Sequence, residues 1–164
     1  MQGMTRRERQ VTDEQQIRHI LDTAKVLRLG LSVQDEPYVV PMNYGYTMEN
    51  GTLTLYLHSA LRGKKLDMMR ANPRVFFELD CDHVPFEGDV GCKYGLSYSS
   101  IMGRGTACIL EDTGEKQKAL SLLMKTQVDK DFSFSEKMVS VVAVIRIDVA
   151  EYTAKHRPLP EAMR

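Results

Sequence analysis

Two short runs of residues constrain the fold of this chain more than any other feature, because each joins a strand-like pattern to polar groups. The first is Pro-Tyr-Val-Val-Pro-Met-Asn-Tyr at residues 37–44, and the second is Tyr-Leu-His-Ser-Ala-Leu-Arg-Gly-Lys-Lys at residues 56–65. Pro41 removes one ladder donor, so we expect the first run at a sheet edge or a bulge. In the second run the apolar alternation stops at His58-Ser59, and a helix follows.

Turn and periodicity signals in the rest of the chain predict an antiparallel sheet. Glu49-Asn50-Gly51 is typical of a hairpin turn, because Asn-Gly tolerates positive φ angles. We expect six strands, at Leu27–Val33, Tyr38–Tyr46, Thr52–His58, Arg74–Leu79, Leu96–Leu110 and Val139–Val149. We expect three helices: one from Thr12 with a capping box to Gln15, one over Leu61–Arg70, and one capped by Asp112 with Glu115 completing the box. Residues 80–95 are predicted to form a loop. Six strands joined mostly by hairpins are typical of a compact antiparallel barrel with flanking helices.

Composition limits the classes of partner. The 164 residues are expected to form one domain, with residues 1–11 as an N-terminal arm and 156–164 as a C-terminal tail. The 22 basic and 22 acidic residues balance, which disfavours nucleic acid and anionic lipid as partners. The longest apolar stretch, Val139–Ile147, is too short to span a membrane. With three scattered cysteines and no hydrophobic signal segment, we expect a reduced, cytoplasmic protein.

The second run suits a phosphate. Ser59 supplies a hydroxyl, the first helical turn leaves N–H groups unpaired, and Lys64 and Lys65 add charge, with Arg62 as a planar fork. The same residues also fit a solvated basic helix face. In the first run, the free backbone groups near Met42 can address a planar ring, although a protected edge strand explains that run equally well.

The motifs together resemble the FMN-binding split-barrel family of pyridoxamine 5′-phosphate oxidase, and most closely its nitroimidazole-resistance (Nim-type) branch. The resemblance rests on Met4–Arg7, Pro37–Tyr46, Tyr56–Ala60, Gly63–Leu66, Asn72–Val75 and Tyr98–Gly105. It extends over about residues 4–155. It implies a mainly β (α+β) fold, a six-stranded antiparallel split β-barrel with flanking helices.

The resemblance also implies an FMN site. Lys64 and Lys65 match a pair that holds the FMN phosphate, and His58 and Ser59 match a segment beside the flavin and its ribityl chain. The other residues carried over are Val40, Pro41, Met42 and Asn43, beside the isoalloxazine ring, and Ser99 and Ser100, from the neighbouring chain. Family members are homodimers with FMN at the interface, so a homodimer is expected.

The chain departs from the oxidase itself, because it has no tryptophan and lacks the Trp- and Arg-rich C-terminal segment that grips pyridoxal phosphate. Vitamin B6 oxidation is therefore not expected. The leading hypothesis is a flavin-dependent reductase that passes electrons from NAD(P)H to a small acceptor such as a nitroaromatic. His58 is the catalytic candidate, since its proton moves near neutral pH, but it could equally only pack on the flavin.

Two alternatives remain open at this stage. A non-catalytic flavin or haem protein, serving as a store or sensor, would bind its cofactor without turnover. The chain has no G-x-G-x-x-G nicotinamide-binding motif that would count against this alternative. A deazaflavin reductase is disfavoured by the His-Ser-Ala segment. Cys81, His83 and Cys92 match no compact zinc template, so no metal site is predicted. We expect His19 to be solvated and His156 to lie in the tail.

Overall fold

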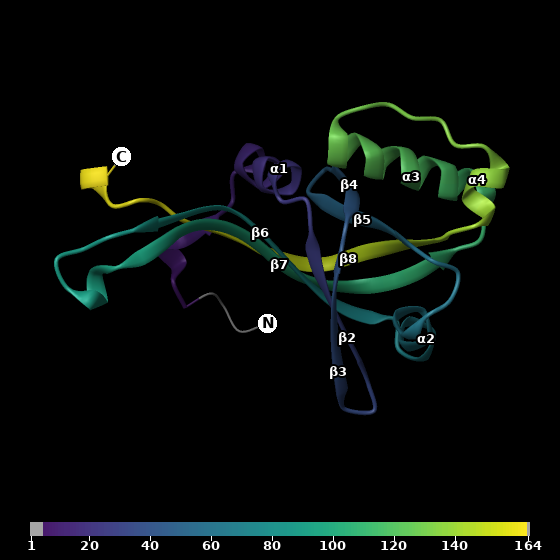
Figure 1. Ribbon diagram of the computed structural model, residues 1–164, viewed down its shortest axis with the longest axis horizontal. Helices are drawn as coiled ribbons and strands as arrows, with labels where there is room; N and C mark the ends of the chain where they lie inside the picture. Colours follow the sequence, from purple (N-terminus) through teal and green to yellow (C-terminus); the bar gives the residue numbers. More distant parts are fainter. Residues whose placement is uncertain (1–4, 164) are drawn as a thin grey trace.

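The computed structural model describes residues 5–163, which form an eight-stranded antiparallel sheet with helices packed around it (Figure 1). The strand order is β3-β2-β6-β7-β8-β5-β4, and β1 pairs with β8. The strands are β1 Gln10–Val11, β2 Leu27–Val33, β3 Glu36–Met42, β4 Tyr44–Glu49, β5 Thr52–Ser59, β6 Arg74–Phe86, β7 Gly95–Leu110 and β8 Ala143–Arg157. The predicted fold class, an antiparallel sheet with flanking helices, is confirmed.

The sheet is split rather than closed. β3 and β4 stand at opposite ends of the strand order, yet only Asn43 separates them in the chain. The single strand predicted over residues 38–46 therefore divides at Asn43 and not at Pro41. Because β3 is an edge strand, the sheet tolerates the absence of an N–H donor at Pro41. With β1, this division raises the strand count from the predicted six to eight.

Four α-helices flank the sheet: α1 Glu14–Thr23, α2 Lys64–Ala71, α3 Thr113–Val128 and α4 Glu136–Ser140. The predicted capping box at Thr12 is wrong by one residue, because Asp13 caps α1 by accepting from the Gln16 N–H at 2.9 Å. The Asp112 cap of α3 is confirmed, with the Glu115 N–H donating at 2.8 Å. α2 begins at Lys64, three residues later than the predicted Leu61. Short 3-10 helices lie at Arg7–Arg9, Gly91–Lys93 and Glu161–Met163.

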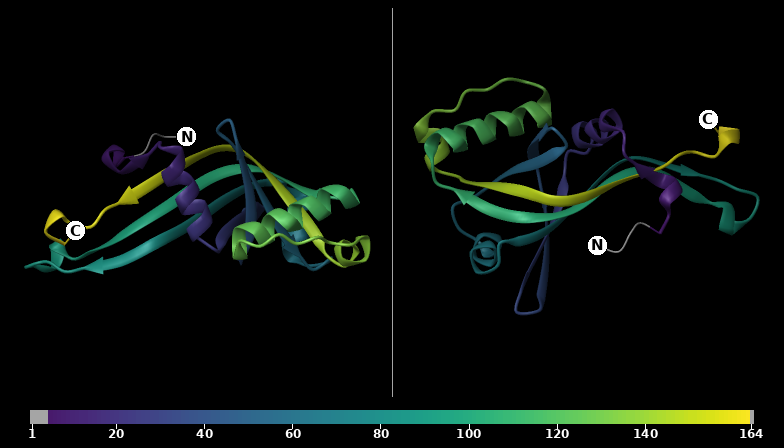
Figure 2. Two further views of the ribbon diagram at one scale, coloured as in Figure 1. Left: turned by 90° about the horizontal axis from the view of Figure 1, so that it is seen from above. Right: turned by 180° about the vertical axis from the view of Figure 1, so that it is seen from behind.

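The segment predicted as a loop over residues 80–95 is instead the end of a long β-hairpin. β6 continues to Phe86 and β7 begins at Gly95, with a bulge between Cys81 and Val84. β8 pairs along β7 as far as Arg157, so the predicted tail from residue 156 is part of the sheet at its start. We call the end of the hairpin, with the paired end of β8, the β-arm; it reaches away from the body of the molecule (Figure 2). The charged residues and glycines of this segment hide the alternation typical of a strand. Pairing with the neighbouring strands nevertheless holds the segment in the sheet.

The start of β8 also differs from the prediction. Val139 belongs to α4, and the strand begins at Ala143. The strand is buried on both faces only over Ala143–Ile145, which explains its continuous apolar sequence there.

The core lies inside the coiled sheet. β5 shows the alternation plainly, because Leu53, Leu55 and Leu57 are all buried. α3 and α4 lie on one side of β5 and β8, and α2 lies on the other (Figures 1 and 2). A second, smaller apolar cluster forms beneath α3 and α4. Within residues 5–163 no helix is long and apolar enough to cross a membrane.

Candidate functional site

The start of α2 has the features of an anion site. Its N-cap is Gly63, which has a φ of 140° and makes no side-chain cap. The N–H groups of Leu66 and Asp67 donate to the Gly63 carbonyl at 2.9 and 3.3 Å. In the described part of the chain, the N–H groups of Lys64 and Lys65 have no acceptor. Unpaired N–H groups at the positive end of a helix dipole, beside two ammonium groups, suit a phosphate.

The two lysines differ in their surroundings. Lys64 Nζ lies 2.6 Å from Glu36 Oε1 and 5.0 Å from the centroid of the Tyr38 ring, both on β3. The hydrogen bond from Lys64, and then its charge, lowers the pKa of the Glu36 carboxyl. Lys65 is half-buried and forms no ion pair among residues 5–163. Lys64 is therefore held against β3, while Lys65 is available to a ligand.

The far end of α2 is tied to the same hairpin. Asn72 Nδ2 donates to the Ser32 carbonyl of β2 at 2.9 Å. Ser32 pairs with Pro37 across the hairpin. Contacts at both ends thus place α2 beside the β2–β3 hairpin, which explains why the first run and the lysines come together.

Along β3, alternate side chains point to opposite faces. Val40 packs against the core and Met42 is buried in it, whereas Pro41 is exposed. The Asn43 amide donates at 3.2 Å to the Lys25 carbonyl and at 3.2 Å to Gln127 Oε1. The Asn43 side chain therefore anchors the split between β3 and β4. Contacts with a ligand are left to the exposed Pro41 and the backbone edge of β3.

A groove of about 680 Å³ crosses the outer face of the sheet beside β3. Val39 and Phe76 line it and are 65% and 40% exposed. Arg74 and Arg104 also line it; Arg104 pairs with Glu151, and Arg74 makes no ion pair in the described residues. The motifs of the sequence did not predict this groove. The groove could have been recognised from Arg74 and Phe76, which share one face of β6, and from Arg104, which pairs with Phe76 on the next strand.

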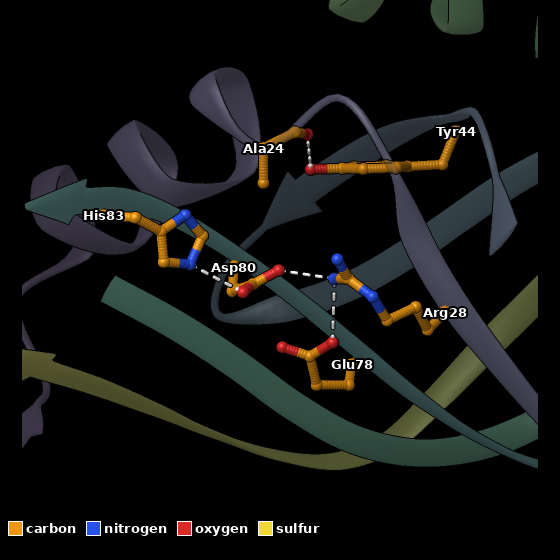
Figure 3. Close-up of polar contacts among 6 residues, drawn as sticks. All are labelled: Ala24, Arg28, Tyr44, Glu78, Asp80 and His83. Atoms are coloured by element: carbon orange, nitrogen blue, oxygen red, sulfur yellow. Dashed lines mark hydrogen bonds and ion pairs between the residues drawn. The ribbon is translucent and has the colours of Figure 1, made fainter. Parts of the chain in front are cut away.

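In a neighbouring charge cluster on β2 and β6, Arg28 is already paired with carboxylates (Figure 3). Arg28 Nη1 lies 3.1 Å from Glu78 Oε2 and also contacts Asp80, whose other oxygen is 2.6 Å from His83 Nε2. Burial, and then the nearby Asp80 charge, raises the pKa of Glu78. Two carboxylates surround Arg28, so this guanidinium is a poor candidate for binding a phosphate.

His58 and Ser59 end β5 and face opposite ways. Ser59 is buried and its hydroxyl donates to the Ala60 carbonyl at 2.9 Å. His58 is exposed and lines an apolar pocket of about 350 Å³ beneath α3 and α4. In one chain, the structure therefore places His58 on the α3 side of the sheet, and the lysines across it at α2.

Ser99 lies in a buried polar network beneath α1. Its hydroxyl is 2.9 Å from Nδ1 of His156, and Asp82 is 3.1 Å from Nε2 of His19. Burial raises the pKa of Asp82, but hydrogen bonds from Ser99, Cys81 and His19 outweigh it, and the pKa is lowered overall. Although Ser99 is buried, His19 at the other end of this network is exposed, as expected, and only its contact with Asp82 was not foreseen. The expectation that His156 lies in a tail is wrong, because His156 is part of β8.

Ser99 and Ser100 are distant from α2 within one chain. Thr106 of β7 pairs with Arg74, which closely follows α2, and Ser100 is six residues farther along the strand. At the rise of a β-strand this is about 20 Å. Within one chain, these serines therefore lie well away from α2.

The sequence profile of the pyridoxamine 5′-phosphate oxidase family matches residues 13–156. The chain belongs to this family. Among curated proteins, none matches it. It is similar to the crystal structure of a candidate 5-nitroimidazole antibiotic resistance protein from Bacteroides thetaiotaomicron VPI-5482, with 33% identity, 90% of this chain and 86% of that chain covered, and a TM-score of 0.76.

Two further structures share the fold of this family. An FAD-binding protein from Mesorhizobium loti is 25% identical, with 89% of this chain and 96% of that chain covered and a TM-score of 0.62. The flavocytochrome Anf3 from Azotobacter vinelandii is 17% identical, with 96% and 73% covered and a TM-score of 0.77. At that identity the second likeness supports the fold alone.

For this family member, the predicted site residues therefore fall into three places. Lys64 contacts Glu36 and Tyr38 at the start of β3, and the predicted residues 40–43 continue along that strand to its far end. His58 faces the pocket beneath α3, and the Ser99–Ser100 pair lies in the β7 region near the β-arm. The roles assigned to these residues stay predictions.

Proposed function

We propose that the protein is a flavin-dependent reductase that binds FMN and passes electrons from NAD(P)H to a small acceptor. The observation that carries the proposal is the start of α2. It combines two unpaired N–H groups, a glycine cap and two lysines next to an exposed strand edge. Family membership and the FAD-binding relative from Mesorhizobium loti support a flavin as the ligand.

The residues at this end of the molecule fit FMN. Its phosphate would take the N–H groups of Lys64 and Lys65 and their ammonium groups. A Cβ at Gly63 would meet nothing within 4 Å, so the space in front of the helix is open. The ring would lie against the edge of β3, near Val40, Pro41, Met42 and Asn43. When bound, the flavin supplies the redox chemistry, and the protein binds and orients it.

A homodimer completes this site in the proposal. Ser99 and Ser100 would come from the second copy, because they are about 20 Å from α2 in their own chain. Exposed apolar side chains on the outer face, such as Val39, Phe76 and Met102, suit coverage by that copy. Size-exclusion chromatography with light scattering tests this part, and a monomer that binds FMN normally would overturn it.

The test of the function begins with the purified protein. We expect a flavin absorbance band or, for flavin-free protein, a rise in Tm on adding FMN. FMN should stabilise more than FAD or riboflavin, because the start of α2 suits a terminal phosphate. Anaerobic oxidation of NAD(P)H with a nitroaromatic acceptor should then depend on FMN. A protein that FMN neither colours nor stabilises contradicts the proposal.

Cofactor binding without turnover would favour the alternative of a flavin store or sensor. The two outcomes are separable, because the absorbance band reports binding and the anaerobic assay reports electron transfer. Adding haem to the same Tm measurement distinguishes the haem alternative.

A further inference from the structure

An apolar pocket lies beneath α3 and α4, and the proposed phosphate site does not use it. Its volume of about 350 Å³ falls within the range of small-molecule sites. Of the residues that line it, only His58 is polar. The apolar walls include Leu120, Leu123 and Met124 of α3, Phe134, and Met138 of α4.

Hydrogen bonds hold the walls of this pocket in place. Gln117 Nε2 donates to the Phe134 carbonyl at 2.6 Å, and the Ser121 hydroxyl donates to the Phe132 carbonyl at 2.8 Å. Both donors are on α3, so they fasten the segment between α3 and α4 to the helix. A pocket that is already formed loses little free energy to ordering when a ligand binds.

The chemistry of the lining indicates the class of ligand. His58 is exposed and makes no hydrogen bond or ion pair in the described part of the chain. An imidazole N–H at the edge of an apolar cavity suits a ligand with one accepting atom and an apolar body. Phe134 and the thioethers of Met124 and Met138 favour an aromatic ring as that body.

We propose that this pocket binds a one-ring aromatic molecule carrying a hydrogen-bond-accepting group, and that His58 donates to that group. That this molecule is the electron acceptor rests on the proposed function, whereas binding itself does not. His58 and Lys64 are separated by five residues, so the same short segment would contact both the acceptor and the cofactor phosphate.

Methyl NMR of the full chain with labelled methionine tests this inference, with nitrobenzene as the probe and nitrocyclohexane as a comparison without an aromatic ring. We expect saturable shifts at Met124 and Met138, assigned through Met→Leu variants, and none at the core residues Met68 and Met69. Met138→Asp should weaken nitrobenzene binding at least tenfold, because it places a carboxylate at the apolar rim. Val90→Asp is the matched control on the distant β-arm, with a similarly exposed side chain.

The measurement is made with and without FMN, so the two proposals fail separately. Without FMN binding, a saturable shift at Met124 and Met138 still supports the pocket. Shifts that do not saturate, that spread to Met68 and Met69, or that survive Met138→Asp overturn it. Changes at Met138 caused by dilution of the protein alone would assign the pocket to an interface between copies and would also overturn it.

Discussion

The start of α2 and the pocket beneath α3 are close in the chain but differ in chemistry. The first is exposed and carries Lys64 and Lys65, and the second is apolar with His58 as its one polar residue. Residues 60–63 connect them, passing from the α3 side of the sheet to the α2 side (Figure 1). One short segment can therefore serve two ligands, and substitutions should separate its two roles.

The largest expected effect concerns the lysines. The Lys64→Ala, Lys65→Ala double variant should weaken FMN binding about a hundredfold, on the scale of lost charge-assisted hydrogen bonds. It should also remove the preference for FMN over riboflavin, which lacks the phosphate. Fluorescence titration measures both affinities. The matched control replaces Lys118 and Lys130, which are exposed elsewhere. A double variant that still prefers FMN would place the phosphate at another site.

Tyr44→Phe should weaken the fold and leave both regions unchanged. The buried Tyr44 hydroxyl shares its one proton between the carbonyls of Leu21 and Ala24, each at 2.6 Å. Figure 3 shows the contact with Ala24. Losing this donor should lower the free energy of unfolding by about 1–2 kcal/mol, measured by urea denaturation. The exposed Tyr94→Phe is the control. An altered preference for FMN over riboflavin in Tyr44→Phe would show that the start of α2 depends on the division between β3 and β4, beside which Tyr44 lies.

His58→Ala should leave FMN affinity intact and lower kcat/KM for a nitroaromatic roughly tenfold, the scale of one hydrogen bond. Steady-state kinetics under anaerobic conditions measures the change. His58→Gln keeps an N–H donor and should recover part of the loss. If His58→Ala weakened FMN binding as much as it lowered kcat/KM, His58 would instead pack on the cofactor.

The smallest effect concerns Glu36, which competes with a phosphate for Lys64. The pKa of Glu36 is lowered, so the ion pair is present above the usual range for a carboxyl and is lost only as the pH falls below it. At neutral pH, Glu36→Gln should tighten FMN binding about two- to fivefold. Asp35→Asn, in the same turn, is the control. Unchanged affinity in Glu36→Gln would mean that Lys64 does not contact the phosphate.

Local signals in the sequence predicted much of the architecture. The strand at Leu27–Val33, the Asn50-Gly51 turn and the Asp112 cap are as expected, because each depends on neighbouring residues alone. The strands of the β-arm were missed, because the charges and glycines of residues 80–95 hide the strand pattern, and pairing across the hairpin and with β8 stabilises them. The division at Asn43 was missed because it depends on a distant contact: its amide bonds to Gln127, 84 residues away.

The candidate site was predicted in its parts and not in its arrangement. The lysines and the Pro41 strand were recognisable from residue type and spacing. That Lys64 contacts Glu36 and Tyr38, and that His58 faces a pocket built by α3, depends on contacts between segments far apart in the sequence. The contacts of His19 with Asp82 and of His156 with Ser99 also have no local signal.

The sequence by itself determined the antiparallel strands, the helix start with its two lysines and the membership of the family. The strands and the helix start follow from periodicity, capping and turn chemistry, which act over a few residues, and the family follows from the match over residues 13–156. Only the tertiary structure decided which of these features share a space. The sheet coils back, α2 docks on one side and α3 on the other, and so one ten-residue run contributes to two sites of opposite polarity.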